Sequence, residues 1–164
     1  MSTLTLFCGP PGSGKTTLAR RLEAEGSGIR LCTDDWQDEI GIPMADAAAH
    51  ERLQQRLYRL AMDLLGRDVD VILEDGLWRR EERERVFADA RARGARIRWH
   101  ILEVPPEELW RRLQERERRG DPGTATVGRA ELEAILALFE PPAPEEMAAA
   151  DEVTLHRPAQ PPLP

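Results

Sequence analysis

The sequence contains no asparagine, a single lysine, two cysteines and no long apolar run. Without asparagine the N-K-x-D guanine-recognition element is absent, which excludes a guanine-nucleotide switch. Cys8 and Cys32 lie at the ends of apolar runs without C-x-x-C spacing, and this predicts reduced core residues with no disulfide and no zinc. No apolar run approaches the roughly 20 residues that span a bilayer. The N-terminus leads directly into a strand pattern, so we expect a cytoplasmic protein with no signal peptide and no membrane partner.

Net charge and length bear on the partners and the number of domains. The formal net charge is -7, which disfavours a nucleic-acid partner, because phosphate backbones are held by clustered positive charge. A local arginine patch remains compatible with this balance. The 164 residues fit one domain that buries its own core. We expect a single domain over 1–156 and a disordered proline-rich tail over 157–164, as a monomer or a homodimer.

The single lysine lies in a phosphate-loop pattern, G-x-x-x-x-G-K-[ST], set between an apolar strand and a helix. Glycines allow the backbone to turn its N–H groups inward around phosphate oxygens. The helix that follows directs its positive end to the same point. The predicted nucleotide-binding residues are Gly9, Pro10, Pro11, Gly12, Ser13, Gly14, Lys15, Thr16 and Thr17.

Lys15 is the only lysine among 23 basic residues. Its compact ammonium is suited to the β- and γ-phosphates, whereas a planar guanidinium would not replace it. The Thr16 hydroxyl is the expected ligand of Mg²⁺. ATP and Mg²⁺ are therefore the expected cofactors.

Strand and helix patterns alternate along the chain. The predicted strands cover 3–8, 29–33, 69–74, 97–104 and 152–155. The predicted helices cover 15–25, 46–65, 79–93, 105–117 and 129–139. This alternation predicts a parallel sheet with helices on both faces, whose ligands lie at the carboxyl ends of the strands.

Acidic residues follow two of these strands. Asp34 and Asp35 follow the second, where Asp34 is a candidate general base for a hydroxyl and Asp35 a candidate contact to Mg²⁺ or its waters; the alternative is a helix cap. Glu74 and Asp75 follow the apolar third strand, as a carboxylate does in the second nucleotide-site motif of phosphate-loop proteins. We prefer Glu74 as the metal residue and expect one member of that pair to face solvent.

Arginines are concentrated before the loop at 120–128. Arginine clamps transferring phosphate through bidentate contacts, and a mobile segment brings it in when substrate binds. Arg112 and Arg116 share a helix face and are the candidate catalytic arginines; pairing with nearby glutamates is the alternative. Trp36 and Trp78 follow the acidic residues, so they are candidates for walls of a substrate pocket as well as for core positions.

With these residues placed, the chain resembles the P-loop kinase superfamily, in the group of small AAA-type ATP-binding proteins similar to polynucleotide kinases, gluconate kinases, chloramphenicol phosphotransferase and zeta-toxin kinases. The resemblance runs from Leu4 to about Val153. It rests on the phosphate loop, 33–36, 71–83 and 139–142.

The resemblance implies a three-layer α/β/α fold with a five-stranded parallel sheet, like that of nucleoside monophosphate kinases. It also implies that Asp34 is the catalytic base and that a lid covers about 112–128. Two residues depart from the pattern. Gln37 replaces the arginine of the D-x-x-R element of polynucleotide kinases, and Glu74 stands where relatives tend to have aspartate.

Three functions follow from these residues. The leading one is an ATP-dependent kinase that phosphorylates a hydroxyl of a small molecule, with Asp34 and Trp36 and Trp78 on the acceptor side. The second has a polynucleotide or nucleotide 5′-hydroxyl as acceptor. The third is a regulatory ATP-binding protein with slow hydrolysis.

Overall fold

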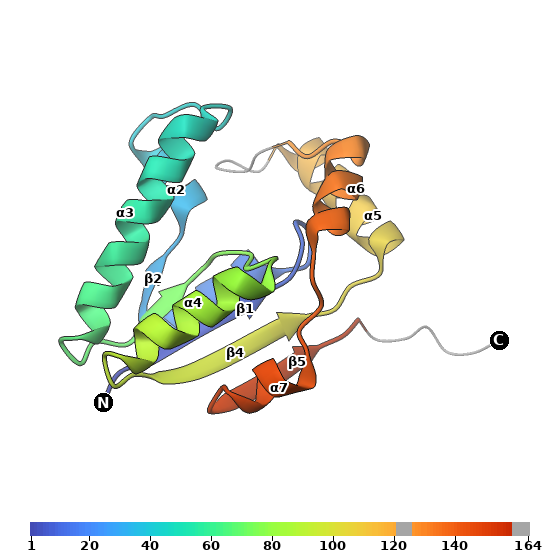
Figure 1. Cartoon of the computed structure of the whole chain (residues 1–164). Coiled ribbons are helices and arrows are strands. Elements are labelled where there is room, and N and C mark those ends of the chain that lie inside the picture. The colour runs from blue at the N-terminus through green and yellow to red at the C-terminus, as the bar shows by residue number, and fades with distance from the viewer. Residues whose placement is uncertain (121–125, 159–164) are drawn as a thin grey trace.

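Five parallel strands form one sheet in a computed structural model that describes residues 1–120 and 126–158 (Figure 1). The strand order is β2-β3-β1-β4-β5, and every neighbouring pair is parallel. The strands are β1 (Thr3–Cys8), β2 (Ile29–Leu31), β3 (Val71–Leu73), β4 (Arg96–Leu102) and β5 (Glu152–His156). The predicted fold class, a three-layer α/β/α phosphate-loop fold, is confirmed.

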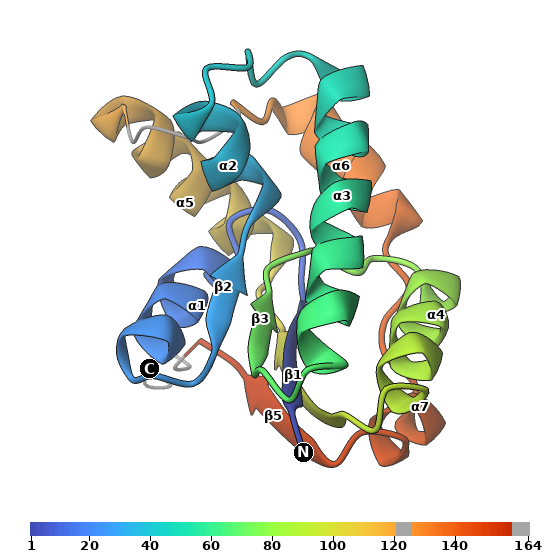
Figure 2. The same ribbon diagram turned by 90° about the vertical axis from the view of Figure 1, so that its left-hand side faces the viewer.

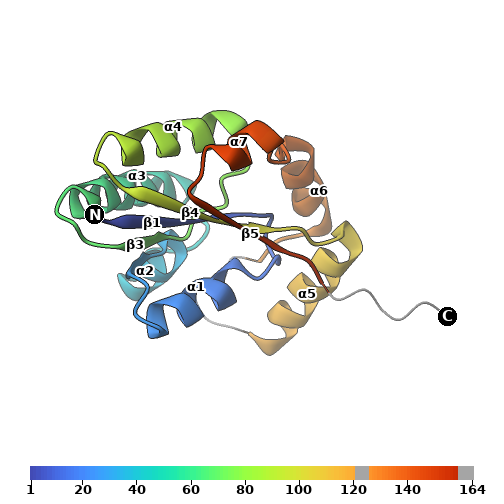
Figure 3. The same cartoon turned by 90° about the horizontal axis from the view of Figure 1, so that it is seen from below.

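Helices cover both faces of this sheet, as Figure 3 shows along its edge. The helices in the described ranges are α1 (Lys15–Ala24), α2 (Thr33–Glu39), α3 (Ala47–Leu65), α4 (Arg80–Arg91), α5 (Pro106–Arg119), α6 (Arg129–Leu138) and α7 (Pro144–Ala148). None of them has the length and apolar character needed to cross a bilayer.

The central strand β1 explains the two-sided core. Its side chains alternate between the faces, so Leu4 and Leu6 pack in the cluster that includes residues of α3 and α4. Phe7 points to the opposite face and packs with Leu18 and Leu22 of α1. A strand buried on both faces has the continuous apolar pattern typical of parallel sheets.

The sheet topology places the phosphate loop between two helical units. Because β1 lies between β3 and β4, the loop that leaves β1 emerges at the centre of the sheet. The β2 edge lies on one side of it and the β5 edge on the other. Figures 1 and 2 show α2 and the start of α3 on one side of this loop and α5 with α6 on the other. This edge of the sheet is where a ligand is expected.

The structure corrects several predicted boundaries. The second strand ends at Leu31, and Thr33 begins α2, whereas the sequence predicted strand to Thr33. Asp34 and Asp35 lie in the first turn of α2, where negative charge stabilises the helix N-terminus. β3 is shorter than the predicted 69–74, and β4 spans 96–102 rather than 97–104. The helices α2 and α7 are not predicted by the sequence, because helices of seven and five residues are too short to show an apolar period.

Two predicted segments fall partly outside the described residues. The predicted lid over 112–128 includes 121–125, and the predicted tail over 157–164 is described only at Arg157 and Pro158. Arg157 Nε donates a 2.5 Å hydrogen bond to Glu103 beside β5.

Candidate active site

The phosphate loop joins β1 to α1 through backbone angles that favour glycine. Gly12 and Gly14 have φ of 81° and 101°, in the left-handed region that side chains rarely adopt. Gly12 also lies directly under α5, because a Cβ atom there would be 3.1 Å from the Leu109 carbonyl oxygen. The Ser13 hydroxyl is buried, and within the described residues it has no hydrogen-bond partner. A buried hydroxyl of this kind suits a loop that receives phosphate oxygens.

Lys15 folds back over the same loop. Its Nζ donates to the carbonyl oxygens of Gly9 and Pro10 at 2.8 and 2.9 Å. Burial lowers the pKa of Lys15 to about 8, against the opposing effect of Glu74. Thr17, also predicted to bind nucleotide, is exposed at the start of α1. The loop therefore presents backbone, hydroxyl and ammonium groups at one point.

Thr16 and Glu74 meet at the carboxyl edge of the sheet. The Thr16 hydroxyl donates a hydrogen bond to Glu74 Oε1, and Glu74 is buried. A hydroxyl and a carboxylate are oxygen ligands of the kind Mg²⁺ takes, and Mg²⁺ is usually held by one or two carboxylates with substrate phosphates and waters. The described residues contain no cluster of three or more His, Cys, Asp or Glu side chains that could hold a metal by themselves. The Thr16 and Glu74 pair fits Mg²⁺ shared with a nucleotide.

Arg30, which the sequence analysis did not identify, lies beside this pair. Its side chain is 7% exposed, and its Nη1 donates to Glu74 Oε2 at 2.7 Å. Arg30 also contacts Asp35 and, at 3.2 Å, Glu23. Asp35 therefore pairs with Arg30 and with Arg20 of α1, and these pairs hold it beside Glu74. A polar residue between Ile29 and Leu31 in a short strand was the one available signal, since alternation turns it to the opposite face.

Asp34 lies at the start of α2 and faces α3. Its Oδ1 is 3.7 Å from His50 Nδ1, and His50 Nδ1 is 2.8 Å from Gln37 Oε1. Burial raises the pKa of Asp34, while the charges of His50, Arg116 and Lys15 oppose this rise. Lys15 and Arg116 are therefore close enough to Asp34 for their charges to act on it. His50 was not predicted as a site residue, because its role depends on how α2 and α3 pack.

Asp75 bonds to a residue of α3. Gln54 Nε2 donates to Asp75 Oδ1 at 3.2 Å, and burial raises the pKa of Asp75 to about 6. The expectation that Glu74 or Asp75 faces solvent is wrong, since the former is buried and the latter half-buried. The strand ends at Leu73, so strand alternation no longer applies to the two residues that follow.

The candidate arginines lie on α5, on the other side of the phosphate loop. Arg112 Nη1 donates to the Ser13 carbonyl oxygen at 3.4 Å, and its Nε donates to Glu108 at 2.7 Å. Arg116, one turn further along, exerts its charge on both Lys15 and Asp34. Both arginines therefore border the phosphate loop from a helix that is continuous to Arg119.

The two candidate tryptophans lie in different places. Trp36 is 38% exposed and lines a cavity of about 220 Å³ with Glu23, Arg30, Cys32, Asp35 and Glu39. This cavity lies on the Arg30 side of α2. The Trp78 indole packs against Gly76, where a Cβ atom would lie 2.3 Å from Nε1. Neither tryptophan has a described contact with Asp34, so their role in binding an acceptor stays a prediction.

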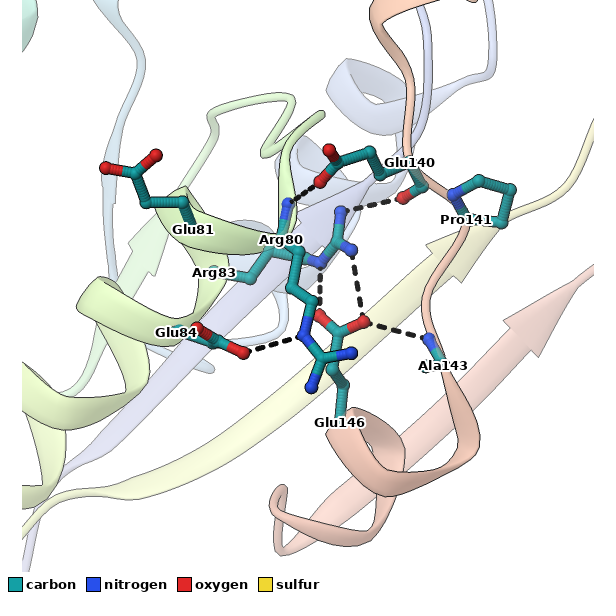
Figure 4. A pocket seen from close by; sticks show the side chains of 8 residues that line it. All are labelled: Arg80, Glu81, Arg83, Glu84, Glu140, Pro141, Ala143 and Glu146. Atoms are coloured by element: carbon teal, nitrogen blue, oxygen red, sulfur yellow. Dashed lines mark hydrogen bonds and ion pairs between the residues drawn. The ribbon is translucent and has the colours of Figure 1, made fainter.

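A buried arginine ties the loop after β3 to the segment after α6. Arg83 is 1% exposed and forms two hydrogen bonds with Glu146, at 2.7 and 3.2 Å. Its Nη1 also donates to the carbonyl oxygens of Leu77 and Glu140. Arg83, Glu140 and Glu146 border a cavity of about 400 Å³, and Figure 4 shows the guanidinium of Arg83 between Glu140 and Glu146. This network joins the segments 71–83 and 139–142, which are separate in the sequence.

The histidines at the sheet edge are structural. His100 is buried in β4, stacks on Phe7 at 5.6 Å and lies 3.0 Å from His156. Burial lowers the pKa of His100 to about 4. A neutral imidazole in a buried strand suits a core position.

Comparisons with known proteins show the fold and the family of this chain. No curated protein matches the sequence. Among solved structures, Kti12 of Chaetomium thermophilum with ADP-AlF3 has a TM-score of 0.70 at 20% identity, covering 94% of this chain and 88% of that one. A sugar kinase from Janibacter has a TM-score of 0.65 at 20% identity, with coverage of 99% and 88%. A chain of the Pnkp1/Rnl/Hen1 RNA repair complex has a TM-score of 0.70 at 22% identity, with coverage of 84% and 43%.

Likeness at these identities shows a shared fold, and a shared fold does not fix an acceptor. The family is shown by the sequence itself, since residues 4–142 match the model of a family described as AAA domain. This range contains the phosphate loop, Asp34, Glu74 and the arginines of α5. The chain therefore belongs to this AAA domain family and has the fold of the P-loop kinases.

Proposed function

We propose that the protein is an ATP-dependent kinase that transfers the γ-phosphoryl group of ATP to a hydroxyl of a small molecule. The observation that carries this proposal is the position of Asp34. It lies across the phosphate loop from α5, at the start of a helix that faces α3, and its pKa responds to the charges of Lys15 and Arg116. A hydrolytic switch has no need of a carboxylate on the acceptor side, whereas a kinase does.

In the proposed reaction the bond between the γ-phosphorus of ATP and the β,γ-bridging oxygen breaks, and that oxygen leaves with ADP. A new bond forms to the acceptor oxygen, and the hydroxyl proton passes to Asp34. A pKa raised by burial makes this carboxylate a stronger proton acceptor than an exposed one. Lys15 and the loop amides balance charge on the phosphates.

Thr16 and Glu74 are the residues that would hold Mg²⁺. When bound, the ion would neutralise charge on the phosphate oxygens. Arg30 holds the second oxygen of Glu74 at 2.7 Å, which leaves the first oxygen directed at Thr16. Glu74 is therefore a better candidate for this role than Asp75, which bonds to Gln54.

Arg112 and Arg116 are the proposed phosphate clamps of a lid over about 112–128. They support charge on the transferred group from the side opposite Asp34. The α5 and α6 helices pack through a small apolar cluster of their own, which includes Leu109, Leu113 and Leu132. A unit with its own core can shift as a body over the phosphate loop.

A nucleic-acid acceptor has less support. Gln37 replaces the arginine of the D-x-x-R element of polynucleotide kinases. Its side chain is fully buried, and its Nε2 donates to the Pro43 carbonyl oxygen at 2.7 Å. That position therefore offers no cation to an acceptor phosphate. Incubation with labelled ATP and 5′-hydroxyl oligonucleotides tests this alternative. Fast labelling of the oligonucleotides would show that a nucleic acid is the acceptor and a small molecule is not.

The test of the proposal is an Asp34→Asn variant assayed against sugars, nucleosides and hydroxylated antibiotics. Loss of a general base should lower acceptor-dependent transfer by about 10²- to 10⁴-fold, with ATP affinity nearly unchanged. Product is measured as acceptor phosphate and ADP, and ATP affinity by calorimetry.

Asp38→Asn is the matched control, because Asp38 lies on the same helix but is exposed. It should transfer phosphate at the wild-type rate. Normal turnover by Asp34→Asn would refute the base assignment. Slow ATP hydrolysis that no acceptor accelerates would instead favour a regulatory ATP-binding protein.

A further inference from the structure

The loop after β3 contains a residue in a backbone conformation that side chains rarely adopt. Leu77 has a φ of 47°, in the left-handed region that is strained for a residue other than glycine. Its side chain is buried in the core cluster that includes residues of α3 and α4. Its carbonyl oxygen accepts hydrogen bonds from Cys8 Sγ at 3.5 Å and from Arg83 Nη1 at 3.1 Å. These contacts hold residues 76–78, the Leu77 turn, in place.

The Leu77 turn is bonded to the start of the phosphate loop. The Gly76 carbonyl oxygen accepts from the Gly9 N–H at 3.3 Å, and Cys8, which donates to Leu77, is the last residue of β1. Glu74, the proposed metal residue, lies two residues before Gly76. A displacement of the turn would therefore act on the phosphate loop and on Glu74 together.

The chain that leaves α6 is bonded to the same region. Glu140 is the second residue after the end of α6. Its N–H donates to the Trp78 carbonyl oxygen at 2.8 Å, and its carbonyl oxygen accepts from Arg83 Nη1 at 2.9 Å. Its carboxylate accepts from the Arg80 N–H at 2.5 Å (Figure 4). Three groups of Glu140 therefore anchor one end of the α5 and α6 unit to the segment 78–83.

Arg83 joins these two sets of contacts through one side chain. Its Nη1 donates to the carbonyl oxygens of Leu77, Trp78 and Glu140. Its Nε and Nη2 donate to Glu146, which fixes the plane of the guanidinium. Because the donors of a guanidinium keep a rigid geometry, a shift of Glu140 would move Arg83 against the Leu77 turn.

The α5 and α6 unit also contacts the phosphate loop directly. Arg112 Nη1 donates to the Ser13 carbonyl oxygen at 3.4 Å. The unit therefore reaches the loop by two routes, at Ser13 through Arg112 and at Gly9 through Arg83 and the Leu77 turn. A side chain that is already in place before a ligand binds contributes more to affinity than one that must be ordered on binding.

We propose that Arg83 is a positioning residue that couples the α5 and α6 unit to the nucleotide site through the Leu77 turn. It keeps the unit oriented on the phosphate loop, so that Arg112 is in place for the phosphates of ATP. Only 1% of the Arg83 side chain is exposed, so it acts through its neighbours. This inference rests on the proposed kinase function, in which the unit forms the lid, and gives that lid a second connection to the donor site.

A double-mutant cycle in ATP affinity tests this coupling. The full chain is titrated with ATP and Mg²⁺ in a calorimeter as wild type, Arg112→Ala, Arg83→Lys and the double variant. Lysine keeps a positive charge beside Glu146 but lacks the fork that holds the carbonyl oxygens. In the wild-type background Arg112→Ala should raise the Kd by about tenfold, the effect of one charge-assisted hydrogen bond. In the Arg83→Lys background it should raise the Kd by about threefold or less.

Two further variants separate coupling from stability. Val86→Ala truncates a buried side chain one turn after Arg83 on α4, so it should destabilise the fold yet keep the full effect of Arg112→Ala. Arg83→Met combined with Glu146→Leu removes both charges of the buried pair, a replacement that proteins often tolerate. This double replacement should reduce the effect of Arg112→Ala as Arg83→Lys does, and it keeps the test informative if Arg83→Lys folds poorly.

Nucleotide binding is measured without an acceptor, so the outcomes separate this inference from the kinase proposal. An effect of Arg112→Ala that is equal within about twofold with and without Arg83 overturns the coupling and leaves the kinase proposal standing. An equal reduction of that effect by Val86→Ala also overturns the coupling, because general loosening would then explain it. The expected cycle in a chain that phosphorylates no acceptor supports the coupling and refutes the kinase. A wild-type chain that does not bind ATP refutes both.

Discussion

Arg30 lies between three carboxylates that come from three elements, with less than a tenth of its side chain exposed. One guanidinium presents several donors in a fixed plane, so it can hold Glu74 and Asp35 at the same time. Removal of a partner from a buried pair leaves a charge without compensation. We therefore regard Arg30 as a positioning residue for Glu74.

The lysine of the phosphate loop makes nucleotide binding depend on pH. Burial lowers the pKa of Lys15 to about 8, so the ammonium is charged below that pH and loses its proton above it. Only the charged form attracts phosphate. The Kd for ATP should therefore be flat up to about pH 8 and rise by up to about tenfold per pH unit above it.

Calorimetric titration across this pH range measures the effect. Lys15→Arg keeps its charge throughout and should bind ATP more weakly but with little dependence on pH. A wild-type Kd that stays level well above pH 8 would mean that Lys15 does not lose its proton or does not contact the phosphates.

The charge pattern of α5 stabilises the helix and also places arginines beside the phosphate loop. Glu107 and Glu108 lie in its first turn, and Arg116 and two further arginines lie in its last, which suits the helix dipole at both ends. The face formed by Leu109 and Leu113 packs on Gly12, so Arg112 and Arg116 border the phosphate loop. Because α5 touches the phosphate loop by its apolar face, any movement of the proposed lid would also act on that loop.

The link between α4 and the segment after α6 is expected to contribute strongly to stability. Arg83→Met leaves Glu146 buried and unpaired, and breaking a buried pair in this way costs about 3–5 kcal/mol. The free energy of unfolding from urea titration measures this. Because Arg83 also holds Leu77 and Glu140, the loss should loosen both segments.

Arg80→Met is the matched control for this prediction. Arg80 is the same residue type one turn earlier on α4, but it is exposed and pairs with Glu84 and Glu145. Its loss should leave the urea midpoint nearly unchanged. Equal effects of the two substitutions would show that the buried network does not stabilise the fold more than a surface pair does.

One sheet joins the two helical units, α2 with α3 and α5 with α6. The net charge of the whole molecule is -7, whereas Lys15, Arg112 and Arg116 lie around the phosphate loop. ATP with Mg²⁺ should bind the folded state alone. At about 100 times Kd this adds about 2.7 kcal/mol to the free energy of unfolding, or about 5–10 °C in Tm for a chain of this size.

Scanning calorimetry with and without the nucleotide tests this prediction. A single unfolding transition should move to higher temperature, as expected for a single domain. Lys15→Met should lose most of the shift while it keeps the Tm of the nucleotide-free protein. Two separate transitions, with only one of them shifted, would instead indicate that the α5 and α6 unit unfolds independently.

Short-range patterns were enough to predict the phosphate loop, the alternation of strands and helices, and the parallel sheet. These features depend on glycines at fixed spacing and on apolar periods that are visible along the chain. The same patterns missed α2 and α7 and misplaced the ends of β2, β3 and β4, because tertiary contacts decide where a short element ends.

Side-chain partners across elements were beyond reach of the sequence. Asp34 was visible as a candidate because it follows a strand, but its approach to His50 depends on how α2 packs on α3. The preference for Glu74 over Asp75 came from the sequence, but its hydrogen bond with Thr16 did not. The ion pairs of Arg30 with Glu74 and of Arg83 with Glu146 likewise join residues far apart in the chain. Only tertiary structure decides such contacts, because they form where separate elements meet at one edge of the sheet.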